Sequence, residues 1–192
     1  LCELGTKLMI EGIKDDLAQL NVKFDTWFSE ESLHNSGEYQ HVMTVLRDSG
    51  FVTEREGAVW FESSLVGEDK DSVLIRSDGS PTYFASDVAY HYDKLVRRGY
   101  DRVIDIWGAD HQGHIPRMKA VVKALGQDPE KLTVLTCQLV SLRRGEEIVK
   151  ASKRSGDVVT LRELINEVGP DACRYNFLSR SADSQMDFDI EL

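Results

Sequence analysis

A short segment of the chain, Trp107-Gly-Ala-Asp-His-Gln-Gly-His114, holds two glycines, one carboxylate, two histidines and a glutamine. It follows an apolar run and precedes a helical pattern, and open α/β sheets bind ligands at such positions, beyond the carboxyl ends of their strands. Asp110 could accept hydrogen bonds from ribose hydroxyls, and neutral His111 and His114 could each donate one hydrogen bond and accept another. A turn whose polar groups cap a helix is one alternative. A metal site built on the two histidines is a weaker one that we do not predict, because no third strong ligand is obvious.

A second segment, Val149-Lys-Ala-Ser-Lys-Arg-Ser-Gly156, places three cations among small residues. Cations on a loop can stabilise the charge that develops on a transferring phosphate. A solvated basic loop is the alternative on residue types alone. The sequence contains neither GxxxxGK[ST] nor GxGxxG, so nothing in it supports a P-loop or a dinucleotide site.

The elements that would position these segments follow from hydrophobic spacing. The first 75 residues predict an amphipathic helix over 4–20, a second helix through Tyr39, Val42, Met43 and Leu46, and small antiparallel strands over 51–75. From residue 82 strands and helices alternate, which predicts a parallel sheet covered by helices on both faces. The expected order is a strand end at 82–84, a helix capped by Ser86, a buried strand at 102–107, a helix from Pro116, a strand at 132–140, a hairpin through Arg144-Gly145, a helix with a Thr160–Glu163 capping box, and a last helix from Pro170.

Composition sets outer limits. The 192 residues carry a formal charge of −10 and are 41% hydrophobic, values typical of a globular protein with one real core. No run of 18 apolar residues is present, so no membrane contact is predicted. Three scattered cysteines without CxxC spacing favour a reducing, cytoplasmic location. The acidity argues against a general nucleic-acid coat.

Four motifs in order resemble one family. Lys150-Ala-Ser-Lys-Arg154 is similar to the KMSKS signature of class I aminoacyl-tRNA synthetases. With Ser77-Asp-Gly-Ser-Pro-Thr-Tyr-Phe-Ala-Ser-Asp-Val-Ala-Tyr-His91, the segment 107–114 and Val158-Val-Thr-Leu-Arg-Glu-Leu164, it stands in the order seen in arginyl-tRNA synthetases, and Phe188-Asp-Ile-Glu-Leu192 is also similar. The resemblance runs from about Phe24 to the end.

The resemblance implies a ligase that activates arginine with ATP, accompanied by Mg²⁺, and transfers it to tRNA(Arg). By this resemblance Tyr83, Asp87 and His111 bind arginine. A carboxylate suits the permanently charged, planar guanidinium. On residue types alone there are two alternatives. Asp87 would be a first-turn carboxylate that interacts with the helix dipole, and Tyr83 would be an aromatic residue at the edge of the core.

The remaining roles also come from the resemblance. ATP would be held by six residues: Gly108, Asp110, His114, Leu139, Val140 and Ser152. Leu139 and Val140 would act through their backbone, with side chains expected in the core. The catalytic lysines would be Lys150 and Lys153, the latter stabilising the transition state in which pyrophosphate leaves. Ala151 departs from the usual Met, which is mostly a packing residue.

The family's HIGH motif does not occur in the 192 residues. We therefore expect the C-terminal half of a Rossmann-like nucleotide-binding fold, in the α/β class, with a small α+β insertion. Residues 1–75 would belong to the insertion and 76–192 to the second half of the catalytic domain. The parent is expected to be a monomeric enzyme and this piece to be inactive alone. Two alternatives stay open: another class I synthetase or nucleotidyl transferase, and a non-catalytic binding module built from a synthetase half.

Overall fold

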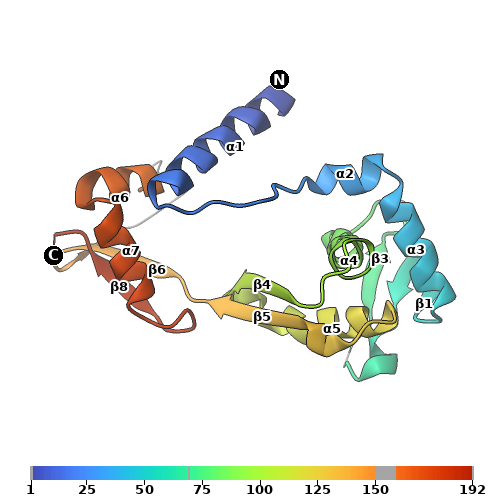
Figure 1. Cartoon of the computed structure of the whole chain (residues 1–192). Coiled ribbons are helices and arrows are strands. Elements are labelled where there is room, and N and C mark those ends of the chain that lie inside the picture. Colours follow the sequence, from blue (N-terminus) through green and yellow to red (C-terminus); the bar gives the residue numbers. More distant parts are fainter. Residues whose placement is uncertain (1, 69, 150–158, 192) are drawn as a thin grey trace. The chain divides into compact units, whose positions relative to one another are not determined.

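The computed structural model describes residues 2–68, 70–149 and 159–191. Its contacts divide the chain into two compact units (Figure 1). One consists of Leu1–Trp27 and Cys137–Leu192, and the other is Phe28–Thr136. These units are defined by the contacts within the chain. The predicted boundary at residue 75 divides the chain by its resemblance to a family instead, and it stays a prediction. Among the described residues, no helix combines the length and apolar character needed to cross a bilayer.

The unit Phe28–Thr136 contains the predicted small antiparallel sheet. Its strands are β1 (Val52–Arg55), β2 (Ala58–Phe61) and β3 (Ser72–Ile75), in that order across the sheet. Glu56 and Gly57 both have positive φ, at 54° and 75°. This is the backbone that a tight two-residue hairpin requires, and it sets the register Arg55↔Ala58.

The same unit contains two helices before the sheet, α2 (Glu30–Asn35) and α3 (Glu38–Asp48). The predicted apolar face of α3 is confirmed, because its residues at helical spacing are all buried: Tyr39, Val42, Met43 and Leu46. They belong to a core that also includes Phe61 and Leu74 from the sheet.

The helix α4 (Tyr83–Tyr92) begins earlier than predicted. Its N-cap is Thr82, whose side-chain oxygen accepts a hydrogen bond from the Ala85 N–H at 3.3 Å. The expected strand end at 82–84 is wrong, and so is the expected Ser86 cap, since Ser86 lies buried inside the helix. Sequence alone could not choose between two hydroxyl residues four positions apart. The earlier start places Tyr83 and Asp87 on one helix, a single turn apart.

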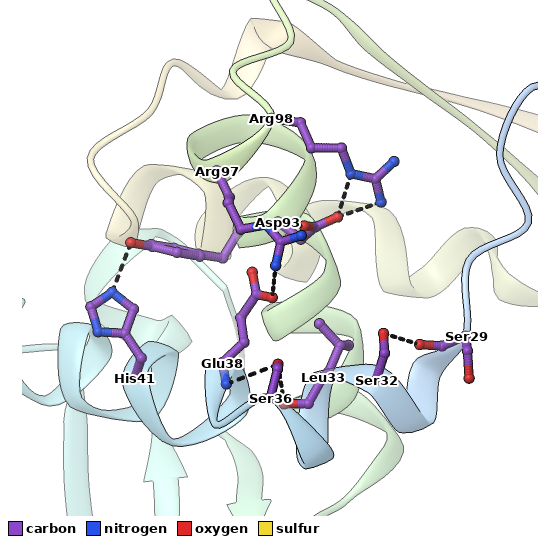
Figure 2. A network of polar contacts seen from close by, with 10 residues as sticks. Ser29, Ser32, Leu33, Ser36, Glu38, His41, Asp93, Arg97 and Arg98 are labelled. Atoms are coloured by element: carbon purple, nitrogen blue, oxygen red, sulfur yellow. Dashed lines mark hydrogen bonds and ion pairs between the residues drawn. The ribbon is translucent and has the colours of Figure 1, made fainter.

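A network of charges joins α3 to the π-helical turn η2 (Asp93–Arg97) that continues α4 (Figure 2). Asp93 is completely buried and accepts a hydrogen bond from Arg98 Nε at 2.5 Å. Its other oxygen lies 3.1 Å from Arg97 Nε, and Arg97 also donates to Glu38 Oε2 at 2.7 Å. The Arg98 guanidinium stands 5.0 Å from the ring centre of Phe28. The network therefore fixes the carboxyl end of α4 against the helices before it.

The remaining elements of this unit follow a strand-helix-strand order. They are β4 (Val103–Gly108), η3 (Ala109–His114), α5 (Ile115–Ala124), η4 (Pro129–Lys131) and β5 (Leu132–Cys137). Strands β4 and β5 are neighbours in a two-stranded sheet. The expected fully buried strand is only half right, because Val103 is buried while Ile106 is 70% exposed. Side chains alternate between the two faces of a strand, and Ile104 and Ile106 share the face of β4 that is exposed.

The second unit holds α1 (Cys2–Gln19), β6 (Val140–Arg144), β7 (Glu147–Ile148), α6 (Leu161–Val168), α7 (Pro170–Leu178) and β8 (Met186–Asp189). Strand β6 pairs antiparallel with β7 through the predicted hairpin and parallel with β8, with Leu142 opposite Phe188. The predicted capping box is confirmed, as the Glu163 N–H donates to Thr160 Oγ1 at 3.2 Å and the Thr160 N–H donates to Glu163 Oε2 at 2.7 Å.

Two predictions for this unit need correction. The expected strand over 132–140 is divided between β5 and β6, and Gln138 between them donates to the Ala182 carbonyl at 2.9 Å. The predicted helix α1 forms, but its apolar Leu4, Leu8 and Ile13 are exposed and only Leu20, just beyond it, is buried. Helical spacing therefore predicted the helix correctly, but it did not predict that these apolar side chains would be exposed in this chain.

Candidate nucleotide and amino-acid site

A pocket of about 850 Å³ lies in the unit Phe28–Thr136, between α4, β4, η3 and the start of α5. Its volume is in the range of pockets that enclose small ligands. Five of the residues predicted for the site line it: Tyr83, Asp87, Gly108, His111 and His114. The structure therefore brings together the three residues assigned to arginine and two of the six assigned to ATP.

Helix α4 supplies one wall through residues spaced one turn apart. Tyr83 is 84% exposed at its first turn, and Asp87 follows four residues later on the same side. The predicted alternative of Tyr83 as a core-edge aromatic does not hold, because its ring is open to solvent. Tyrosine and aspartate together offer one hydroxyl and one carboxylate to a ligand in the pocket.

The carboxyl of Asp87 has a perturbed environment. Its side chain remains exposed, yet the pocket wall removes water from one side, and this desolvation raises the pKa of Asp87 above its usual value. The charges of His91 and Lys94 act in the opposite direction, while Glu30 and Asp105 add to the rise. A perturbed carboxyl in a pocket is typical of functional sites.

Three polar residues at the base of the pocket were not assigned to the site from the sequence. Asp105 on β4 accepts from Lys94 Nζ at 2.6 Å and lies 2.7 Å from His91 Nε2. Burial would raise the pKa of Asp105, but the hydrogen bonds and charges of His91 and Lys94 outweigh it and hold that pKa low. One signal was available, since Asp105 is a single acid inside the apolar run Val103–Trp107.

The segment 107–114 supplies further lining residues, Trp107 and Gly108 at the end of β4 and His111 and His114 on the short helix η3. A Cβ at Gly108 would come within 2.5 Å of Asp110 Oδ1, so a larger residue at this position would displace the exposed Asp110 carboxylate. Asp110 is exposed, and its carboxylate lies 3.6 Å from His111 Nε2. The rings of His111 and His114 are 5.7 Å apart. Asp110 is not among the residues that line the pocket.

The other predicted ATP residues lie elsewhere. Leu139 and Val140 belong to the other unit, and their side chains are exposed, Leu139 by 89%, so the expected core packing is wrong. They stand at the start of β6, where the chain leaves one sheet and enters another. The predicted Lys150, Ser152 and Lys153, with Ala151, fall outside the described residues.

Known proteins resemble the chain over its whole length. An arginine–tRNA ligase from Dehalococcoides mccartyi is 57% identical over all 192 residues, and one from Caldanaerobacter subterraneus is 51% identical over the same span. The chain spans 34% of the length of each, about a third.

Solved structures agree. One from Campylobacter jejuni that is assigned to the arginyl-tRNA synthetases superposes with a TM-score of 0.89 at 39% identity, over 98% of this chain and 41% of that one. The Thermus thermophilus arginyl-tRNA synthetase, at 19% identity and a TM-score of 0.73, shares the fold over 92% of this chain and 40% of that one.

The sequence pattern of one family, the catalytic domain of the class I tRNA synthetases (R), matches residues 2–179. The match covers the pocket, the segment 107–114 and the KMSKS-like loop. The chain belongs to the class I tRNA synthetases (R), as part of their catalytic domain.

Proposed function

We propose that this chain is part of an arginine–tRNA ligase and contributes the arginine pocket and one side of the ATP site. The observation that carries the proposal is the Asp87 carboxylate, which lines the pocket without an ion-pair partner among the described residues, one helical turn from Tyr83. A carboxylate beside a hydroxyl can bind a guanidinium through charge-assisted hydrogen bonds that a lysine ammonium cannot reproduce in the same planar geometry.

The proposed reaction has two steps. A carboxylate oxygen of arginine attacks the α-phosphorus of ATP, the bond from that phosphorus to the β-phosphate oxygen breaks, and pyrophosphate leaves. A hydroxyl of the terminal ribose of tRNA(Arg) then attacks the arginyl carbonyl, and AMP leaves. Tyr83, Asp87 and His111 would hold the arginine side chain, while Gly108, Asp110 and His114 would position the nucleotide.

The other assignments belong to the same proposal. Leu139 and Val140 would contact adenine through their backbone, and Lys150, Ser152 and Lys153 would bind the phosphates. Mg²⁺ would arrive on the ATP phosphates, which suits an ion that keeps few protein ligands. We further propose that the complete enzyme is a cytoplasmic monomer.

A Lys153→Ala change in a full-length synthetase that carries this chain should slow arginine activation on the order of 100-fold. An ammonium that follows the charge of the leaving pyrophosphate contributes mainly to the transition state, so kcat should fall while the KM values change little. Pre-steady-state formation of arginyl-adenylate measures the effect. Lys123→Ala, on the exposed side of α5, serves as the control. An unchanged kcat would remove this role from Lys153.

The 192-residue chain by itself should not support arginine-dependent exchange of pyrophosphate into ATP, because its sequence contains no HIGH motif. The exchange assay compares it with a full-length protein in which the motif is present, with lysine and glutamine as control amino acids. A cooperative thermal transition of the isolated chain establishes that it is folded. Exchange by the isolated chain near the full-length rate would contradict the proposal, and so would equal use of lysine by the full-length protein.

A further inference from the structure

Both ring nitrogens of His91 lie close to oxygen atoms that accept hydrogen bonds. Its Nδ1 lies 2.7 Å from the main-chain oxygen of Asp87, and its Nε2 lies 2.7 Å from Asp105 Oδ2. A carbonyl oxygen can only accept a hydrogen bond, and so can an ionised carboxylate, whereas a neutral imidazole has one N–H to donate. Both contacts can be hydrogen bonds only if both ring nitrogens carry a proton.

A protonated Asp105 would be the other way to satisfy these contacts, and its surroundings argue against it. Lys94 Nζ donates to Asp105 Oδ1 at 2.6 Å, so the carboxyl already faces one cation. The pKa of Asp105 lies below its usual value, because the bonds from His91 and Lys94 outweigh its burial. Lys94 Nζ also lies 3.4 Å from His91 Nε2, but both cations make shorter contacts to Asp105, at 2.6 and 2.7 Å. These shorter contacts fit an ionised Asp105 between an ammonium and an imidazolium.

The charges that face His91 come from each element around it. Helix α4 contributes Asp87, the turn η2 contributes Lys94, and β4 contributes Asp105. Across the same pocket stand His111 and His114 on η3 and Arg117 on α5, and Glu30 on α2 acts on Asp87 from outside the pocket.

The nearest charges form a balanced set. Two cations, His91 and Lys94, stand against two carboxylates, Asp105 and Asp87. Asp105 is paired with both cations. Asp87 is the member that remains available to a ligand.

We propose that His91 is a positioning residue of the arginine pocket, held as an imidazolium by Asp105 so that it fixes the helical turn of Asp87 and keeps the Asp87 carboxylate ionised. The proposal rests on the function proposed above and deepens it. Asp105 alone would repel a second negative charge in the same pocket, and the two cations cancel that repulsion. The ionised Asp87, the one carboxylate of the set that is not paired with a cation, then favours a cationic ligand side chain over a neutral one of the same length.

The charge state of His91 can be measured in the unaltered 192-residue chain. Nitrogen-15 NMR of labelled protein distinguishes protonated from unprotonated ring nitrogens, and correlation of each histidine ring with its own backbone signals identifies His91 in the unaltered chain. We expect both His91 nitrogens to be protonated at pH 7.5. One unprotonated nitrogen at that pH would overturn the proposal. This measurement contains no arginine, so it is independent of whether the full-length enzyme uses that amino acid.

A kinetic test addresses the effect on Asp87. In full-length enzyme, His91→Gln and Lys94→Met each remove a cation, so the pKa of Asp87 should rise further and less of it should be ionised at low pH. We expect the KM for arginine to rise about tenfold more at pH 6 than at pH 8, with the KM for ATP unchanged. A merely structural role would not produce this pH dependence.

The matched control is His41→Gln. His41 belongs to the same unit and is hydrogen-bonded to Tyr92 Oη at 2.9 Å, but it does not line the pocket. The His41→Gln variant should leave both KM values and their pH dependence as they are. Equal changes in the arginine and ATP KM values at both pH values, in variants that melt within a few degrees of the parent, would overturn the proposal. The NMR measurement decides the question should neither variant fold.

Discussion

An Asp87→Asn variant of a full-length synthetase carrying this chain should lose about a thousandfold in kcat/KM for arginine. The amide keeps the shape of the side chain and loses its charge. A guanidinium in the pocket would then lie beside two cations, Lys94 and His91, and beside Asp105, which is already paired with both. It would have no unpaired carboxylate to bind. Removing one partner of a desolvated ion pair costs about 3–5 kcal/mol, and each 1.4 kcal/mol is a factor of ten. Steady-state exchange at varied arginine and saturating ATP measures the loss.

The informative control is a second carboxylate-to-amide change, in the proposed ATP site. Asp110 lies on η3, outside the residues that line the pocket, and we assign it to the ribose of ATP. Asp110→Asn should raise the KM for ATP more than the KM for arginine, whereas Asp87→Asn should do the reverse. If Asp87→Asn raised both KM values equally, the side-chain carboxylate would not be the group that recognises arginine.

Much of the local structure follows from residue types that act over one or two turns. The capping box at Thr160 and the buried face of α3 need only side chains and main-chain groups that are three or four residues apart. The hairpin at Gly145, with φ at 59°, depends equally on its own few residues. Such features are predictable because their stabilising contacts are contained in the segment that shows the pattern.

The errors occur where the deciding contact is distant. Thr82 caps α4 partly because its hydroxyl also donates to the Val73 carbonyl at 2.8 Å, a contact nine residues away that no helical pattern contains. The strand expected over 132–140 divides because Gln138 bonds to Ala182, on the far side of two helices in the sequence. Apolar spacing showed which residues could be buried, but the neighbouring strand decides which of them are.

The candidate site shows the same division. Its loop residues are adjacent in sequence, so Gly108, His111 and His114 were predictable as a group. The pairing of His91 with Asp105 joins a helix to a strand fourteen residues later. It becomes visible only when both elements are placed in one fold. A single acid within an apolar run was the one clue that pointed to it.

Replacing Asp93 by alanine should lower the free energy of unfolding of the unit Phe28–Thr136 by about 3–5 kcal/mol, which is the cost of breaking a buried ion pair by removing one partner. Asp93 is fully buried and holds both Arg97 and Arg98 (Figure 2). Burial alone would lower the pKa of Arg98, but hydrogen bonds to Asp93, Tyr100 and Tyr90 outweigh it and raise that pKa. A guanidinium is not deprotonated in proteins, so Arg98 would stay charged in the variant and lose its counter-charge.

Urea unfolding of the chain, followed by circular dichroism, measures this loss. Arg97→Ala is the matched control, since the Arg97 side chain is 60% exposed and its pairs should contribute no more than about 1 kcal/mol. The double variant Asp93→Ala, Arg98→Ala should be less destabilised than the sum of its single changes, because neither charge is then left alone. Additive losses, or a loss below about 1 kcal/mol in Asp93→Ala, would mean that packing rather than this ion pair holds the turn η2. Because η2 also carries Lys94, that outcome would place the anchoring of the pocket base in the apolar contacts of α4 instead.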